Sequence, residues 1–206
     1  MSFRPDRRRL WLVIAGLAWL AWPVEARAHS PFPGAGDFIG GLLHPVTSPT
    51  HVLAIIGLGL MAGRRTLVEV KEPAITFTIG SALGLSLTLT GMMKTGPSVV
   101  LIVIALMAGT LLASEKFLPL VATNALYGAA GMFLGLDSAV ENGSAWTITK
   151  TLLGNWISLG LLVTDLAIYV TFGANAKWLT IALRIAGSWI IAIALMVLAF
   201  SLRPAP

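Results

Sequence analysis

Residues 38–62 read FIGGLLHPVTSPTHVLAIIGLGLMA. This apolar stretch is long enough to cross a bilayer as a helix, which needs about 20 residues. Pro45 and Pro49 interrupt it, and a proline inside a helix removes a backbone hydrogen bond and clashes with the preceding turn. We therefore expect a membrane span that is broken near its middle, with Ser48 capping a second helical segment that begins at Pro49.

Five more apolar segments follow, at about 73–91, 98–113, 117–136, 146–172 and 178–202. The whole chain is 56% hydrophobic and only 11% charged, whereas soluble domains carry about 25% charged residues. Lipid can cover this much apolar surface and a soluble fold cannot. The sequence thus predicts an all-α membrane protein, a bundle of about six transmembrane helices.

Residues 1–28 have the three parts of a secretory signal peptide. Arginines come first, an apolar core spans 10–22, and Ala26-Arg27-Ala28 fits the small-x-small cleavage pattern. We expect cleavage after Ala28, which leaves 29–206 as a single polytopic domain; the alternative is an uncleaved signal anchor. Much of the formal net charge of +5 lies in this segment. With no basic patch among aromatics, nucleic acid is not an expected partner.

Basic residues of short loops mark the cytoplasmic side of a membrane protein. Here they gather in the loops 63–72, 114–116 and 173–177, which hold Arg64, Arg65, Lys71, Lys116 and Lys177. The predicted location is the bacterial inner (cytoplasmic) membrane, with the mature N-terminus and the C-terminus in the periplasm. Within the segments, Gly80 with Gly84 and Gly131 with Gly135 form GxxxG pairs, which let helices pack closely in lipid.

The three histidines of the chain, His29, His44 and His51, all lie between residues 29 and 51. Imidazole is the commonest side-chain ligand for borderline transition metals. On a regular helix His44 and His51 would share one face about 10 Å apart, but a break at the prolines can fold His44 back toward His51. The cluster favours metal or proton chemistry, and the alternative is an interfacial His44 with a packed His51.

Other polar residues extend or compete with this cluster. As a mature N-terminal residue, His29 could chelate an ion through its amine and ring, or it could be a terminus without a role. Asp37 could add a carboxylate or simply cap a helix before Phe38. Asp165 and Arg184 lie inside the last two segments, where charge is costly, so they are expected to form an ion pair or to line an ion path.

The stretch 29–62, HSPFPGAGDFIGGLLHPVTSPTHVLAIIGLGLMA, resembles the HupE/UreJ family of hydrogenase and urease accessory membrane proteins. The resemblance lies in a glycine-rich lead-in, a His-Pro and a histidine opening an apolar helix with spaced glycines. It implies a signal peptide, six helices and uptake of nickel, or sometimes cobalt. It also implies that His29, His44 and His51 correspond to the family's early histidines.

The chain departs from the family's pattern at two places. Thr50 stands where the family has an aspartate. The family's Phe-His-Gly-x-Ala-His-Gly-x-Glu pattern is matched by residues 133–141, but Leu134 and Ser138 replace its histidines. Asp137 and Glu141 could partly replace the lost ligands and give an oxygen-richer site.

The leading hypothesis is a divalent transition-metal permease that captures its ion through His29, His44 and His51, with Asp37 or Glu141 assisting. Nickel is the first candidate metal, with cobalt, copper or zinc as alternatives. The second hypothesis is a non-transporting membrane subunit that binds metal or packs in a larger complex, with other membrane subunits as partners. An intramembrane serine protease is disfavoured, because no histidine follows Ser86 to act as its base; we do not expect an enzyme.

The cleavage site gives the first testable prediction. Protein expressed in its own host should have an intact mass that begins at His29, because signal peptidase cuts after a small-x-small motif. Intact-mass spectrometry checks this, and a mass that includes residues 1–28 would contradict it.

Overall fold

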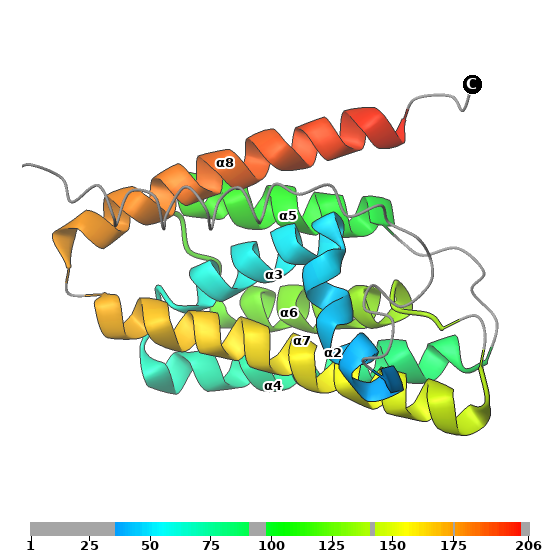
Figure 1. Cartoon of the computed structure of the whole chain (residues 1–206). Helices are drawn as coiled ribbons and strands as arrows, with labels where there is room; N and C mark the ends of the chain where they lie inside the picture. The colour runs from blue at the N-terminus through cyan, green and yellow to red at the C-terminus, as the bar shows by residue number, and fades with distance from the viewer. Residues whose placement is uncertain (1–35, 91–97, 141–142, 175, 203–206) are drawn as a thin grey trace, which may run out of the picture. The chain divides into compact units, whose positions relative to one another are not determined.

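We describe the protein from a computed structural model, in which residues 36–90, 98–140, 143–174 and 176–202 are placed. In these residues the chain forms seven helices and no strand (Figure 1). The all-α fold class is therefore confirmed, while the predicted signal peptide lies outside the described residues. The helices are α2 (Gly36–Thr47), α3 (Pro49–Ala62), α4 (Leu67–Thr88), α5 (Ser98–Ala113), α6 (Leu120–Leu136), α7 (Ala145–Gly173) and α8 (Lys177–Ser201).

The predicted break in the first apolar segment is present between α2 and α3. The two helices meet at an angle of 74°. Ser48 has extended backbone angles, φ −96° and ψ 118°, because a residue before proline is pushed out of the helical region. Ser48 occupies the predicted cap position, but its hydroxyl is bonded to the Thr50 hydroxyl at 3.1 Å and caps no backbone amide.

Two other helix starts differ from prediction for local reasons. α4 begins at Leu67, well before the predicted start at residue 73, because Thr66 and Glu69 form a reciprocal capping box. Pro73 lies inside this helix. α6 begins at Leu120 after Pro119, which has extended backbone angles, so residues 117–119 stay outside the helix. α5 coincides with the predicted segment 98–113.

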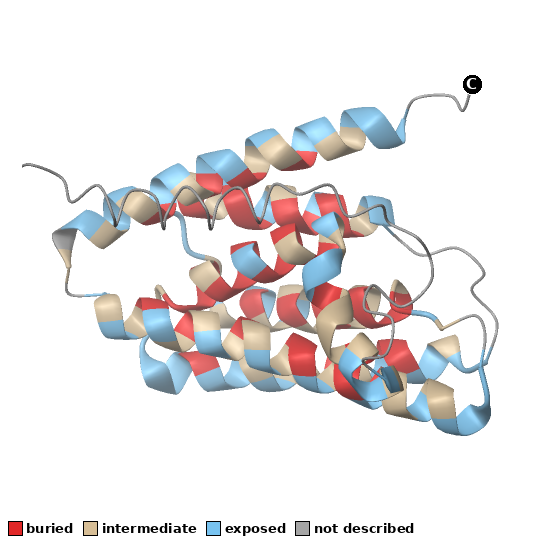
Figure 2. Cartoon of the chain, in the orientation of Figure 1, coloured by how far each residue is buried: buried red, intermediate tan, exposed pale blue. Residues whose placement is uncertain are grey.

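Helices long and apolar enough to span a membrane are present among the described residues. Among the described residues, α7 and the segment Trp178–Ser201 of α8 are long and apolar enough, and the bent pair α2–α3 adds a third if it is one broken span. α5 and α6 are shorter apolar helices. The buried residues of α8 lie on its side toward α5 (Figure 2). Other residues of this helix, such as Trp189, expose large apolar side chains. Such side chains suit lipid, whereas the count of six spans remains a prediction.

The short helix α3 lies at the centre of the bundle. It contacts α2, α5, α6, α7 and α8, and most of its residues are buried. The hydroxyl of Tyr127 on α6, itself fully buried, donates a hydrogen bond to the carbonyl oxygen of Leu58. α3 thus runs through the core from the α2–α3 bend at one end to Gly63 at the other.

Glycines bring the helices of each main pair into backbone contact. A methyl group added at Gly80 or Gly84 of α4 would overlap the backbone of α6, and one added at Gly131 or Gly135 would overlap α4. The two predicted GxxxG pairs therefore face each other across one interface. Glycines play the same part between α2 and α7, between α3 and α7, and between α5 and α8, at Gly41, Gly154, Gly59, Gly63, Gly109 and Gly187.

This interface predicts opposite effects for two neighbouring glycines. Gly131→Ala should lower the free energy of unfolding by about 1–3 kcal/mol, because its methyl group meets the Phe77 carbonyl oxygen and forces the helices apart. Gly128→Ala is the control: its methyl group would lie 3.7 Å from the nearest atom, the Thr76 carbonyl oxygen, and alanine is the better helix former. Thermal unfolding in detergent measures both, and equal melting temperatures would contradict the interface.

Candidate functional site

His44 and His51 meet at the α2–α3 bend. His44 lies in the last turn of α2 and His51 in the first turn of α3. Their ring centroids are 5.2 Å apart and the rings are nearly perpendicular. A straight helix would hold the two residues about 10 Å apart along its axis. The proline break is therefore what brings the two imidazoles together, as the sequence analysis anticipated.

The ring of His51 is oriented by a carboxylate from a distant part of the chain. Its Nε2 lies 2.9 Å from Oδ2 of Asp137, the residue that ends α6. An ionised carboxylate only accepts hydrogen bonds, so Nε2 carries the hydrogen and donates it. In the neutral imidazole, Nδ1 is then left with a lone pair. A histidine held by a carboxylate in this way is the usual arrangement of a metal ligand and its supporting residue.

Asp137 is held as an anion at the edge of the bundle. Burial raises the pKa of its carboxyl group, but hydrogen bonds from His51 and Ser98, together with the nearby imidazoles, outweigh this and leave the pKa below its ordinary value. The Ser98 hydroxyl at the start of α5 donates to Oδ1 at 3.1 Å. Asp137 thus ties together the ends of three helices, α3, α5 and α6.

Two imidazole nitrogens at the bend are buried and unpaired. They are Nδ1 of His51, whose side chain is 0% exposed, and Nε2 of His44. A buried polar atom without a partner costs about 1–3 kcal/mol, and in native proteins it commonly marks a place for a water or an ion. The described residues contain no group of three or more His, Cys, Asp or Glu side chains able to hold a metal. The bend therefore brings together two unpaired imidazole nitrogens and the carboxylate of Asp137.

The other predicted ligands do not join this pair in the described structure. His29 and Glu141 lie outside the described residues. Asp37 is in the first turn of α2 and is not the residue before the helix. Its carboxylate forms an ion pair with Lys150 of α7 at 2.7 Å. The structure thus assigns Asp37 a link between α2 and α7 and does not bring it to the histidines.

The predicted pairing of Asp165 with Arg184 is replaced by another. Arg184 of α8 lies 3.1 Å from Glu115, which follows α5. Asp165 lies on the exposed side of α7, and none of the described residues forms an ion pair with it. The sequence placed Asp165 and Arg184 at a similar depth in the membrane, but the two side chains do not face each other. The side of α7 that packs inward carries Val163, Ala167 and Val170 instead.

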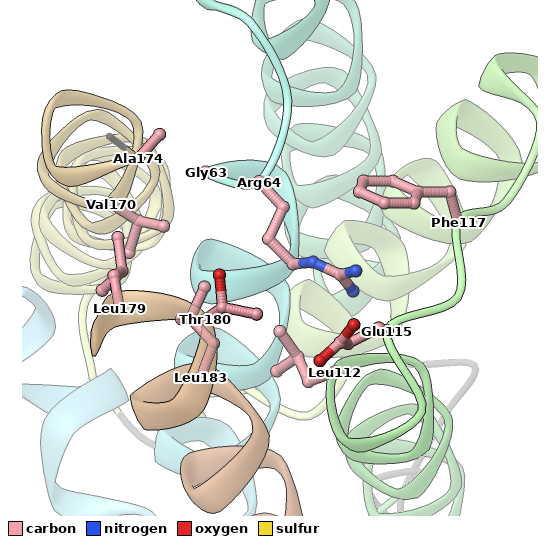
Figure 3. A pocket seen from close by; sticks show the side chains of 10 residues that line it. All are labelled: Gly63, Arg64, Leu112, Glu115, Phe117, Val170, Ala174, Leu179, Thr180 and Leu183. Atoms are coloured by element: carbon pink, nitrogen blue, oxygen red, sulfur yellow. The ribbon is translucent and has the colours of Figure 1, made fainter. Parts of the chain in front are cut away.

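Glu115, the partner of Arg184, lines a cavity of about 260 Å³ at the far end of α3 from the histidines. In Figure 3 the Arg64 guanidinium and the Glu115 carboxylate point toward each other, with Phe117 beside them. Arg64 stacks 4.2 Å from the Phe117 ring and donates to the carbonyl oxygens of Leu111 and Lys116 at 3.1 and 3.3 Å. The loops after α3, α5 and α7 therefore lie at one end of the bundle, which carries Arg64. That this end faces the cytoplasm remains a prediction.

Asp137 has a larger role in the candidate site than the sequence predicted. The sequence indicates this residue only as a substitute for a lost histidine, because nothing in the chain links it to His51, which is 86 residues earlier. Leu134 and Ser138, which replace the family's histidines, are both buried, and the Ser138 hydroxyl bonds to the Leu134 carbonyl oxygen at 2.7 Å. These two positions are filled by packing, so the carboxylate of Asp137 is the functional group that this end of α6 provides.

Comparison with known proteins identifies the family of the chain. The sequence model of the family described as "HupE / UreJ protein" matches residues 17–197. No curated protein and no solved structure gives a significant match. The family match covers most of the chain, including the α2–α3 bend, Asp137 and all seven described helices up to the last turn of α8. The chain belongs to the HupE/UreJ family.

Proposed function

We propose that this protein is a permease for a divalent transition metal ion, nickel or cobalt in the first place, which binds at the α2–α3 bend. The family is associated with nickel and cobalt uptake or with accessory roles. The observation that carries the proposal is the pair of buried, unpaired imidazole nitrogens on His44 and His51 at a break in an apolar helix. Transporters commonly place their ion sites at such breaks.

The donor set suits a borderline metal. Two neutral imidazoles favour nickel, cobalt, copper and zinc over magnesium or calcium. Asp137 supplies negative charge without occupying the ligand nitrogen of His51, and it fixes the tautomer in which Nδ1 can bind. His29 and Glu141 remain proposed as additional ligands on the periplasmic side, and Asp37 is left out because Lys150 holds it.

The proposed route follows α3. The ion would enter beside His51 in the first turn and leave near Gly63, at the cavity of about 260 Å³ that Arg64 and Glu115 line. Between these ends, Gly57 and Gly59 pack closely against α5 and α7. Passage of an ion along α3 would therefore require these helices to move apart as rigid segments. The basic end would face the cytoplasm, in keeping with its arginines.

One observation favours the alternative of a metal-binding subunit without transport. The two positions of α6 that hold histidines in the family are filled here by Leu134 and Ser138, both buried. A path with fewer ligands could still hold an ion without passing it on. Binding and accumulation therefore have to be measured separately.

Cellular accumulation tests transport. Cells that express the protein should accumulate more nickel or cobalt than cells without the gene, and His51→Ala should remove the gain because it deletes one of two imidazole ligands. Gly128→Ala is the control, since that position has room for a methyl group, and it should keep the wild-type level. Accumulation is read by elemental analysis of washed cells at equal protein expression. Wild-type protein that binds metal but gives no gain would support the subunit alternative instead.

The supporting role of Asp137 gives a separate prediction in purified protein. Asp137→Asn keeps the size of the side chain but removes its charge and its firm hold on the His51 tautomer. Loss of such a supporting residue costs about 10–100-fold in metal affinity, measured by calorimetric titration in detergent. Glu115→Gln, at the opposite end of α3, should leave the affinity unchanged. The affinity of every form should fall as the pH is lowered, because protons compete for the imidazoles. An Asp137→Asn affinity equal to wild type would contradict the role.

A further inference from the structure

Asn155 of α7 is a buried amide that the described contacts leave incomplete. Its side chain is 2% exposed, and its Oδ1 has no hydrogen-bond partner. An amide oxygen can accept two hydrogen bonds, and a buried oxygen that accepts none costs about 1–3 kcal/mol. The buried residues on the inward side of α7 are mostly apolar, among them Leu152, Leu159 and Val163, and Ser158 is a second buried polar residue there. Packing alone gives no reason for an amide at this position.

α7 contacts both arms of the α2–α3 bend, and Asn155 lies where the arms converge. Its chain neighbour Gly154 packs against the backbone of α2 at Phe38 and Leu42, and Leu42 is two residues before His44. Further along α7, Leu166 and Val170 pack against Gly59 and Gly63 of α3. These contacts run parallel, since Leu166 faces Gly59 and Val170 faces Gly63, so stepping back along α7 from Leu166 leads toward the start of α3, where His51 lies.

The inward stripe of α7 includes Asn155. Buried residues recur at Asn155, Leu159, Val163, Ala167 and Val170, the spacing of one helix face. Two of them, Ala167 and Val170, contact Gly63 of α3. Asn155 therefore lies on the face that α7 turns toward α3, at the level where α2 crosses. Three unpaired buried atoms, from His44, His51 and Asn155, thus belong to three helices that converge at the bend.

We propose that Oδ1 of Asn155 is a ligand of the same metal ion as Nε2 of His44 and Nδ1 of His51. This inference rests on the proposed function and deepens it, because it adds a neutral oxygen to the two nitrogens. A third ligand from α7 would also tie the site to a helix that packs against both α2 and α3. Nickel and cobalt accept such mixed nitrogen and oxygen donor sets.

The test uses purified full-length protein in detergent with cobalt(II), whose visible absorption reports the number and kind of its ligands. Asn155→Leu has similar size and no donor, and it should weaken cobalt binding by at least about tenfold, the least that is lost with a supporting residue. It should also change the cobalt spectrum. Asn155→Asp keeps an oxygen at the same place and should retain binding, with a spectrum altered by the charged donor. Asn124→Leu is the matched control.

Asn124 of α6 is the other described asparagine with a buried, unpaired Oδ1, and its amide nitrogen donates to Glu72 at 2.9 Å on α4. It lies near the start of α6, away from Asp137, so its loss should leave cobalt affinity and spectrum unchanged. If wild-type protein binds cobalt through His51 but Asn155→Leu binds equally with the same spectrum, the inference is overturned and the proposed function stands. If wild-type protein binds no cobalt, nickel, copper or zinc, the proposed function itself fails. Should Asn155→Leu not fold, an unchanged cobalt spectrum in Asn155→Asp overturns the inference.

Discussion

Pro49 cannot donate a backbone hydrogen bond and forces Ser48 into an extended conformation. That constraint ends α2, starts α3 and sets the 74° angle between them. Without the bend, His44 and His51 would lie nearly two turns apart on one helix, too far apart to contact the same ion. With it, their rings lie 5.2 Å apart, and Asp137, at the end of α6, reaches the second ring. The candidate site is thus a direct product of where the backbone cannot remain helical.

The rest of the bundle holds this bend in place by close backbone contact. In lipid, apolar side chains gain little by leaving one apolar environment for another, so helices associate through tight packing. Gly154 lets α7 approach α2 on one side of the bend, and Gly59 and Gly63 let it approach α3 on the other. The continuous helix α7 therefore packs against both α2 and α3, and the Asp37–Lys150 ion pair further stabilises its contact with α2.

The sequence predicted the features that depend on local pattern. The helical class, the extent of α5, the break at Pro49 and the glycine pairs of α4 and α6 all follow from residues close together in the chain. The start of α4 was misplaced because a capping box outside the apolar run extends the helix. The partners of Asp137 and Arg184 depend on how helices rotate against one another, which apolar segments of similar composition do not specify. Nothing in the sequence distinguishes Asp165, on the outer side of α7, from a residue on its inner side.

The bend also gathers helix ends of both polarities. α2 and α6 finish there, and α3 and α5 begin there. Each helix carries roughly half a positive charge at its start and half a negative charge at its end, so the four ends nearly cancel, and Asp137 leaves the region with close to one net negative charge. Ion conduction requires binding firm enough for entry and loose enough for exit. Under the proposed function, the single negative charge of Asp137 would attract a divalent cation without fully neutralising it, which is the balance that conduction requires.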